Sequence, residues 1–389
     1  MPAFAKAIVG KTLPWLYFLF GLVLPTQLGK HWWPEFSFIN GLRVDYYSPT
    51  LYVSYIILLL LAAVTLPRHY QFFLITLFAL SLGLISYSHL SLYRFVQYAA
   101  IVSAVFVLGY AGREERKKWL AGLFIASGFE LILALWQLVD QRSIQGLWWL
   151  AGERRYYAST PGIAKISLFG QLFVRPYATF SHPNSMGGFY LLTALLLWRE
   201  KKSLWSLPSI LLVLLSFSRI AIMGLAIGLL ITLIPKKLGC RLCYYARVLF
   251  FLWVAAFALL PVGSQTSWTD RLAMWSNGLS RFISNWWHAP QLGNYLYTGT
   301  VLSPTLFLQP IHNSMLIVLM EWRLLGVVLL LAVIALLYKK IPIAVALPLL
   351  LISFFDHYSV SLVQNMLLMG GVIGWYTWSR TSGKMSREV

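Results

Sequence analysis

The stretch "HNSMLIVLMEWRLLGVVLLLAVIALLYKK", from His312 to Lys340, decides the fold class of this chain. It is almost wholly apolar, and a helix that crosses a bilayer needs about 20 such residues. Similar runs recur along all 389 residues, of which 59% are hydrophobic and 11% are charged. We therefore expect an all-α polytopic membrane protein that forms a single transmembrane domain over residues 1–389.

Apolar runs bounded by charged residues or proline predict about twelve transmembrane helices. They are expected at 13–29, 50–66, 71–89, 95–111, 119–139, 183–198, 204–217, 219–235, 247–262, 312–338, 341–355 and 360–378. Two long external loops, 140–182 and 263–311, interrupt this series, and the larger one precedes the tenth helix. Its tryptophans lie at roughly helical spacing, which predicts amphipathic helices at the outer membrane interface.

Basic residues set the expected orientation. The chain has 31 Lys and Arg against 12 Asp and Glu, a formal net charge of +19. Most of them lie in short connections and tails on one side, which the positive-inside rule makes cytoplasmic, together with both termini. Because no soluble basic domain is present, we expect membrane lipids and an anionic substrate as partners, and no nucleic acid.

Neither a cofactor nor a metal is expected. Cys240 and Cys243 have metal-like spacing, but no second pair completes a tetrahedral site, so we interpret them as structural or incidental. The acidic residues of the external side are scattered in sequence and predict no metal site, and no P-loop is present. These acidic residues are Glu35, Asp45, Asp140, Glu153, Asp270 and Asp356.

Arginines beside small polar residues are the first candidates for a functional site. In "FVRPYATFSHPNSMGGF", Phe173 to Phe189, Arg175 precedes His182 and Asn184 at the mouth of the sixth span. The planar guanidinium suits phosphate oxygens, although an arginine at a helix mouth can also simply reach the interface. Arg219, in the shortest external turn, and Arg271, in the second loop, could converge with Arg175 on one anion.

His312 is the candidate general base. It is expected at the outer N-terminus of the tenth span, where the helix dipole disfavours the imidazolium and leaves a ring that can accept a proton. The alternative is a histidine satisfied by local hydrogen bonds. Asp356 and His357 lie in the last external turn and belong either to the interface or to the same cavity.

With "RPYATFSHPN", "SFSRIA", "DRLAMW" and "HNSMLIVLMEW" in this order, the chain from about Arg175 to Gly374 resembles the O-antigen ligase and O-antigen polymerase superfamily. The resemblance implies a GT-C-like fold and metal-independent, inverting glycosyl transfer at the periplasmic face of the bacterial cytoplasmic (inner) membrane. The donor would be a glycan on undecaprenyl diphosphate. The acceptor would be lipid A-core in a ligase, or a second lipid-linked glycan in a polymerase.

The same resemblance assigns roles to residues. Arg175 and Arg271 would hold the diphosphate, Arg219 would support them, and His312 would activate the acceptor hydroxyl. The possible supporting residues are His182, Asn184, Asn313, Asp356 and His357. One departure concerns Glu321, which family members commonly follow with a pair of small residues. Here Trp322 and Arg323 follow it, which leaves the continuity of the helix over 321–325 open.

A ligase is preferred over a polymerase, and two other classes stay open. A flippase for lipid-linked oligosaccharides would also need many helices and internal arginines, but it needs no histidine base and should show repeated halves. A membrane scaffold would tolerate changes to the external polar residues. The first 170 residues match the superfamily only in hydropathy.

Overall fold

The computed structural model describes residues 3–65, 70–168, 170–233, 265–296 and 309–378, and within these ranges the chain is mostly helical. Its helices are α1 (Ala3–Val23), α2 (Val53–Thr65), α3 (Tyr70–Ser81), α4 (His89–Gly109), α5 (Arg113–Asp140), α6 (Pro183–Arg199), α7 (Ser203–Leu215), α8 (Arg219–Leu233), α10 (Gln265–Asn285), α11 (Ser314–Lys340), α12 (Ile343–Phe355), α13 (Tyr358–Ser361) and α14 (Val363–Trp378). Within the described ranges, 3-10 turns lie at Glu35–Ser37, Asp45–Tyr47, Leu82–Leu84 and Gly146–Ala151.

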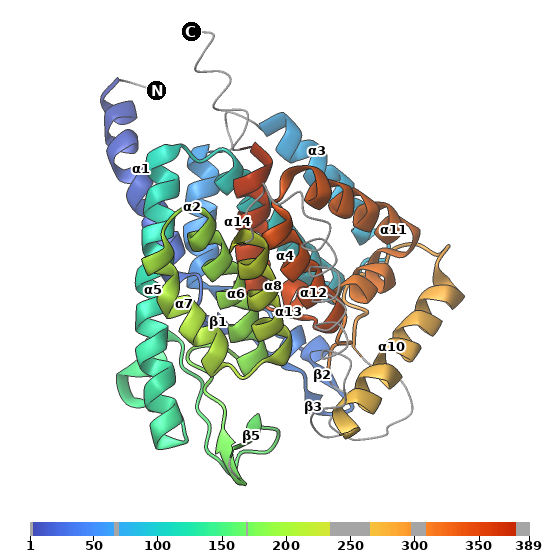
Figure 1. Ribbon diagram of the computed structural model, residues 1–389. Coiled ribbons are helices and arrows are strands. Elements are labelled where there is room, and N and C mark those ends of the chain that lie inside the picture. Colours follow the sequence, from blue (N-terminus) through green and yellow to red (C-terminus); the bar gives the residue numbers. More distant parts are fainter. Residues whose placement is uncertain (1–2, 66–69, 169, 234–264, 297–308, 379–389) are drawn as a thin grey trace, which may run out of the picture.

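The described residues also contain three short antiparallel strand pairs. Strand β1 (Gly29–His31) pairs with β4 (Thr50–Tyr52), and β2 (Phe38–Ile39) pairs with β3 (Leu42–Arg43). In the predicted loop 140–182, β5 (Lys165–Leu168) pairs with β6 (Gln171–Val174). The β5–β6 hairpin projects from one end of the helical bundle, opposite the end at which α1 begins (Figure 1).

The helices agree with the predicted spans in position. Each predicted span overlaps a helix except the one at 247–262, which lies outside the described residues, as do Cys240 and Cys243. Three described helices, α4, α5 and α11, are long and apolar enough to cross a membrane by length and composition. The described residues are mostly helical, as an all-α membrane protein would be, whereas the count of about twelve spans stays a prediction.

The helix predicted in the second long loop is present as α10. It lies beside the bundle in Figure 1 and packs against α11. Met274 is buried in a cluster with Ile311 and Leu316, whereas Leu279 and Ile283 on other faces of α10 are exposed. The segment is therefore amphipathic in the folded chain, and its place at a membrane interface stays a prediction.

The core is centred on α6, which is buried along almost its whole length and contacts α7, α8, α12 and α14. Glycines let other helix pairs approach closely. A Cβ at Gly122 of α5 would overlap the Phe18 carbonyl of α1, and a Cβ at Gly374 of α14 would overlap the Val105 carbonyl of α4. Close backbone contact of this kind is how helices associate in an apolar environment.

Helix α11 is interrupted at Arg323, where φ is 56° and ψ is −131°. The sequence left the continuity of the helix over 321–325 open, and the structure shows that the helix is kinked there. The residues around the kink bond to the segment that follows α10: the amide of Leu324 donates to the Trp286 carbonyl at 3.0 Å, and the amide of Gln291 donates to the Glu321 carbonyl at 2.8 Å. The interruption is therefore compensated by bonds to another segment.

A buried ion pair fixes the kink to α4. The Arg94 Nε donates to Glu321 Oε1 at 2.8 Å and its Nη2 donates to Oε2 at 3.1 Å, and both side chains are almost completely buried. The amide of Gly293 also donates to Glu321 Oε1 at 2.8 Å. One carboxylate thus connects α4, α11 and the segment after α10.

We predict that Glu321→Gln lowers the free energy of unfolding by about 3–5 kcal/mol, because it leaves the Arg94 charge buried without its partner. The measurement is thermal or denaturant unfolding of the purified chain. Asp45→Asn is the matched control, since it removes the carboxylate of the exposed Arg43–Asp45 pair at 3.1 Å and should cost no more than about 1 kcal/mol. Equal losses in the two variants would contradict this role of Glu321.

Candidate functional site

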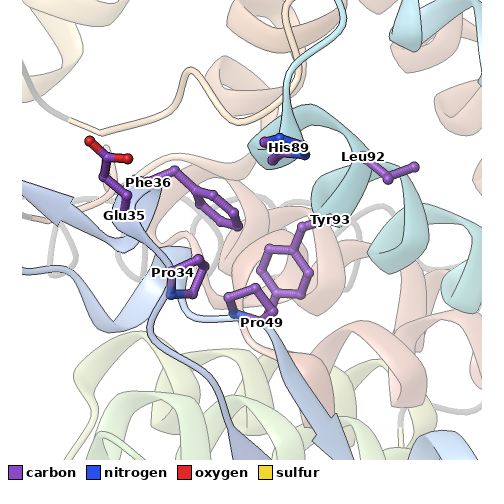
Figure 2. A pocket seen from close by; sticks show the side chains of 7 residues that line it. All are labelled: Pro34, Glu35, Phe36, Pro49, His89, Leu92 and Tyr93. Atoms are coloured by element: carbon purple, nitrogen blue, oxygen red, sulfur yellow. The ribbon is translucent and has the colours of Figure 1, made fainter.

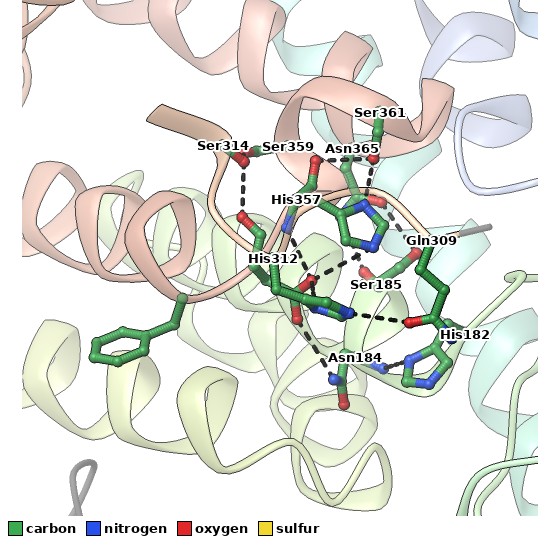
Figure 3. Close-up of polar contacts among 12 residues, drawn as sticks. His182, Asn184, Ser185, Gln309, His312, Ser314, His357, Ser359, Ser361 and Asn365 are labelled. Carbon is green, nitrogen blue, oxygen red and sulfur yellow. Dashed lines mark hydrogen bonds and ion pairs between the residues drawn. The ribbon is translucent and has the colours of Figure 1, made fainter. Parts of the chain in front are cut away.

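The candidate site is built around the buried carboxylate of Asp356, in the turn between α12 and α13. Figure 3 shows polar contacts of this region, among them those of His312, His357 and Asn184. The Asp356 Oδ1 lies 3.3 Å from His312 Nδ1 and accepts a hydrogen bond from the His357 amide at 2.9 Å. Its Oδ2 accepts from Asn184 Nδ2 at 3.4 Å. One side chain thus brings together the starts of α6 and α11 and the α12–α13 turn.

Backbone contacts hold this arrangement in place. The Asp356 carbonyl accepts hydrogen bonds from the amide of Ser314 at 3.0 Å and from its hydroxyl at 2.8 Å. The Ser314 Oγ also lies 2.6 Å from the Ser359 Oγ. The first turn of α11 is therefore tied directly to the turn that carries Asp356.

His312 lies two residues before α11, at the helix N-terminus where it was predicted. The indole of Trp275 on α10 donates to the His312 carbonyl at 2.8 Å, and His312 Nε2 lies 3.4 Å from Gln309 Oε1. Its neighbour Asn313 caps α11, because its Oδ1 accepts from the Leu316 amide at 2.8 Å. The structure thus gives Asn313 a helix-capping role.

His357 is buried beside His312, with ring centroids 4.8 Å apart. Its Nδ1 lies 2.6 Å from the Ser361 Oγ, and its Nε2 lies 4.0 Å from Asp356 Oδ1. Within the described residues, His312, Asp356 and His357 form a group whose ligand-type atoms all lie within 4.8 Å of one another. The scattered acidic residues in the sequence gave no sign of this cluster, because folding brings its members together.

Two of the predicted arginines reach the same place. Arg175 donates through Nη2 to Asn184 Oδ1 at 2.6 Å and through Nε to the Ser216 carbonyl at 2.9 Å. Arg271 donates through Nη1 to the carbonyl of Phe355 at 2.8 Å, directly before Asp356. Both guanidinium groups are thus held by neutral acceptors close to Asp356. Asn184, which binds Arg175, also contacts the Asp356 carboxylate, and Phe355, which binds Arg271, directly precedes Asp356.

The third predicted arginine and the capping histidine lie at the edge of this network. Arg219 begins α8, is exposed, and lies within electrostatic range of Arg271. His182 is the N-cap of α6, where its Nδ1 accepts from the Asn184 amide at 3.1 Å. The structure therefore assembles Arg175, Arg271 and His312, with Arg219 farther out.

Burial and charge set the protonation states of the site. Burial raises the pKa of Asp356, but the hydrogen bond and charge of His312, followed by His357 and Arg271, hold that pKa well below its usual range. Burial, and then the charge of Arg175, lowers the pKa of His182 to about 3. Burial, and then His312, lowers the pKa of His357 to about 3. A charged Asp356 carboxylate thus lies beside the positive charge of Arg271, whereas His182 and His357 are neutral near pH 7.

A cleft of about 1050 Å³ reaches the site and is lined there by His182, Gln309 and Ser361. The rest of its wall is rich in basic and aromatic residues. It includes Trp33, Arg43, Asp45, Tyr46, Trp149, Arg154, Arg155 and Tyr177. Of these, Tyr46 packs against His357 and Tyr177 against His182. The sequence reasoning named Asp45 without a role and quoted Tyr177 only as part of the arginine motif. It missed the other residues, because the first 170 residues carried no motif; the paired arginines of "GERRYY" in the long loop were the available signal.

A second hollow of about 490 Å³ lies between the 3-10 turn Glu35–Ser37 and the start of α4 (Figure 2). Its walls are mostly apolar, and Tyr93 lines both this hollow and the larger cleft. The lining residues are Pro34, Glu35, Phe36, Pro49, His89, Leu92 and Tyr93. Of the candidate site residues, His182 lines the larger cleft, together with Gln309, which contacts His312.

Comparison with known proteins identifies no relative: no family model, no curated protein and no solved structure matches this chain. The superfamily resemblance therefore stays an expectation carried by the motifs.

We predict that His182 makes the protein less stable in acid. Its folded pKa is about 3 and its unfolded pKa is about 6.5, so the unfolded chain binds the extra proton between these values. The contribution to stability is complete above about pH 6.5 and declines as the pH falls, by about 2 kcal/mol at pH 5.

His182→Asn should reduce this decline, because asparagine can still cap α6 but does not titrate. The measurement is the unfolding free energy at pH 7 and pH 5. His288→Asn, at an exposed histidine, is the control. An unchanged pH dependence in His182→Asn would refute the assignment.

Proposed function

We propose that this chain is a lipid-linked glycan transferase of the O-antigen ligase type. It would move a glycan from undecaprenyl diphosphate to a sugar hydroxyl of lipid A-core at the periplasmic face of the bacterial cytoplasmic membrane. The observation that carries the proposal is the contact of His312 with the buried carboxylate of Asp356, beside Arg175 and Arg271 and next to a polar cleft.

The His312–Asp356 pair supplies the base. With a proton on Nδ1, facing Asp356 Oδ1 at 3.3 Å, the ring has its lone pair on Nε2. That nitrogen faces Gln309, which lines the cleft. A carboxylate in this position orients the imidazole and stabilises the imidazolium once it has taken the proton of an acceptor hydroxyl.

The arginines supply charge stabilisation for the leaving group. In the proposed step the acceptor oxygen bonds to the anomeric carbon, the bond from that carbon to the diphosphate oxygen breaks with inversion, and the hydroxyl proton moves to His312. The diphosphate leaves with the bonding electrons. Arg175 is fixed by Asn184 and Ser216, and Arg271 by Phe355, so these charges are oriented before the donor arrives.

The exposed surface supports the membrane location. Large apolar side chains on four helices are more than half exposed in the isolated chain, as lipid-facing residues would be. Examples are Leu59 of α2, Phe78 of α3, Ile132 of α5 and Leu331 of α11. In this proposal the end of the bundle that bears the β5–β6 hairpin faces the periplasm, and both termini face the cytoplasm.

A polymerase would use the same chemistry with a second lipid-linked repeat as the acceptor. The deciding assay uses purified protein with undecaprenyl-diphosphate glycan and either lipid A-core or additional donor. Transfer to lipid A-core supports the ligase, and chain extension supports the polymerase. Absence of transfer to either acceptor would overturn the proposed function.

We predict that His312→Gln lowers kcat for glycan transfer by roughly 10²–10⁴-fold, because a positioned base contributes about that factor. Binding of the donor should change little, since the arginines remain. His89→Gln, at an exposed histidine outside the site, should retain full activity. Wild-type turnover by His312→Gln would remove the base assignment.

We also predict that Arg175→Lys and Arg271→Lys each lower kcat/KM for the lipid diphosphate donor by roughly 10-fold or more, because lysine cannot replace the bidentate fork. The KM for the acceptor should stay close to its wild-type value. Arg113→Lys, at the exposed start of α5, is the matched control. Donor kinetics that are unaffected in both site variants would show that these arginines do not bind the diphosphate.

A further inference from the structure

We infer that His312, Asp356 and His357 also form a binding site for a divalent transition metal, best suited to Zn²⁺, and that the bound metal blocks the base. The three ligand-type atoms are His312 Nδ1, Asp356 Oδ1 and His357 Nε2. This site is additional to the proposed transfer reaction, whose steps use protein side chains alone.

The contacts of His312 allow its second tautomer. When His312 Nε2 carries the proton, it donates to the Gln309 Oε1 that faces it at 3.4 Å and can only accept. The lone pair then lies on the buried Nδ1, which faces Asp356 Oδ1 at 3.3 Å. In this tautomer a bound cation would take the place that the Nδ1 proton holds between the two atoms in the base tautomer.

His357 points a second nitrogen lone pair at the same carboxylate. The hydroxyl of Ser361 donates its one proton to the His357 carbonyl at 2.8 Å. The contact of 2.6 Å between Ser361 Oγ and His357 Nδ1 therefore uses a proton on Nδ1. This leaves the lone pair on Nε2, which lies 4.0 Å from Asp356 Oδ1.

The spacing suits a tetrahedral ion. Zn–N and Zn–O bonds of about 2.0–2.2 Å place neighbouring ligand atoms about 3.3 Å apart. The His312–Asp356 pair is already at 3.3 Å. The His357–Asp356 contact of 4.0 Å would need to shorten by about 0.7 Å, and the two histidine nitrogens, which lie within 4.8 Å of each other, by up to about 1.5 Å. Two imidazoles and one carboxylate favour Zn²⁺ over Mg²⁺ or Ca²⁺, and a water would complete the coordination.

In each ligand residue, the second nitrogen or oxygen, which would not bind the metal, also contacts a neighbouring side chain. Gln309 contacts the other nitrogen of His312, Ser361 contacts the other nitrogen of His357, and Asn184 donates to the second oxygen of Asp356. Such outer partners fix the tautomer and the orientation of metal ligands. Arg271 opposes the metal, because its charge lies close to Asp356, so removing that charge should strengthen binding.

The consequence for catalysis rests on the proposed function. A metal on His312 Nδ1 keeps the proton on Nε2, and the ring then cannot accept a proton from the acceptor hydroxyl. Zn²⁺ should therefore inhibit glycan transfer, and a chelator should restore it.

Metal binding is tested on the purified full chain in lipid nanodiscs by calorimetric titration with ZnCl₂ and MgCl₂. We expect one Zn²⁺ site and no Mg²⁺ binding there. Asp356→Asn and His357→Gln should each weaken Zn²⁺ at least about 10-fold, Arg271→Gln should tighten it, and His89→Gln should leave it unchanged. On the unaltered chain, Co²⁺ should give the visible spectrum of a tetrahedral ion.

The outcomes are distinguishable. Equal Zn²⁺ affinity in the wild type, Asp356→Asn and His357→Gln, or an octahedral Co²⁺ spectrum, would overturn the metal site. The Co²⁺ spectrum requires no substitution, and a gain of affinity in Arg271→Gln cannot arise from misfolding. Transfer that persists at saturating Zn²⁺ would contradict the block of the base, whereas Zn²⁺ binding without any glycan transfer would contradict only the proposed function.

Discussion

The burial of the Asp356 carboxylate is the constraint on which the site depends. A buried anion is costly unless donors and opposite charges surround it, and here they come from segments far apart in sequence. Asn184 at the start of α6, His312 before α11 and the amide of His357 all contact it. Satisfying this one charge therefore requires the two helix starts to meet at the α12–α13 turn.

A second buried carboxylate, that of Glu321, fixes α11 farther along its length. Glu321 binds Arg94 of α4 and the amide of Gly293, just before the break at Arg323. The segment from Ser314 to Arg323 is thus held at its start by the Asp356 turn and at its end by the Arg94 ion pair. His312 precedes a helical segment that cannot easily shift along its axis, which is what a precisely placed base requires.

The sequence predicts the parts of this structure that depend on local pattern. Apolar runs predict the positions of the helices, and the apolar stretch after Asn313 places His312 at a helix start. The unusual Arg323 indicates the place of the kink. Patterns of this kind depend on neighbouring residues, so a single chain is enough to interpret them.

The proximity of site residues that are far apart in sequence could not be predicted from such local patterns. Asp356 and His312 meet because α11 and α12 pack together, and nothing near either residue in sequence encodes that contact. The basic cleft wall is a similar case, since Arg43 and Arg154 come from different loops and share Asp45 as a charged partner. The short hairpins were missed because their strands are only two to four residues long.

The electrostatic state of the site explains why a base and arginines can be combined there. Without a donor, the charges of Arg175 and Arg271 oppose any further positive charge, and the buried His182 and His357 stay neutral. In the proposed reaction the anionic diphosphate neutralises the arginines, which favours the uptake of a proton by His312. The base would therefore be strengthened by the donor itself, and acceptor activation would be coupled to occupancy of the donor site.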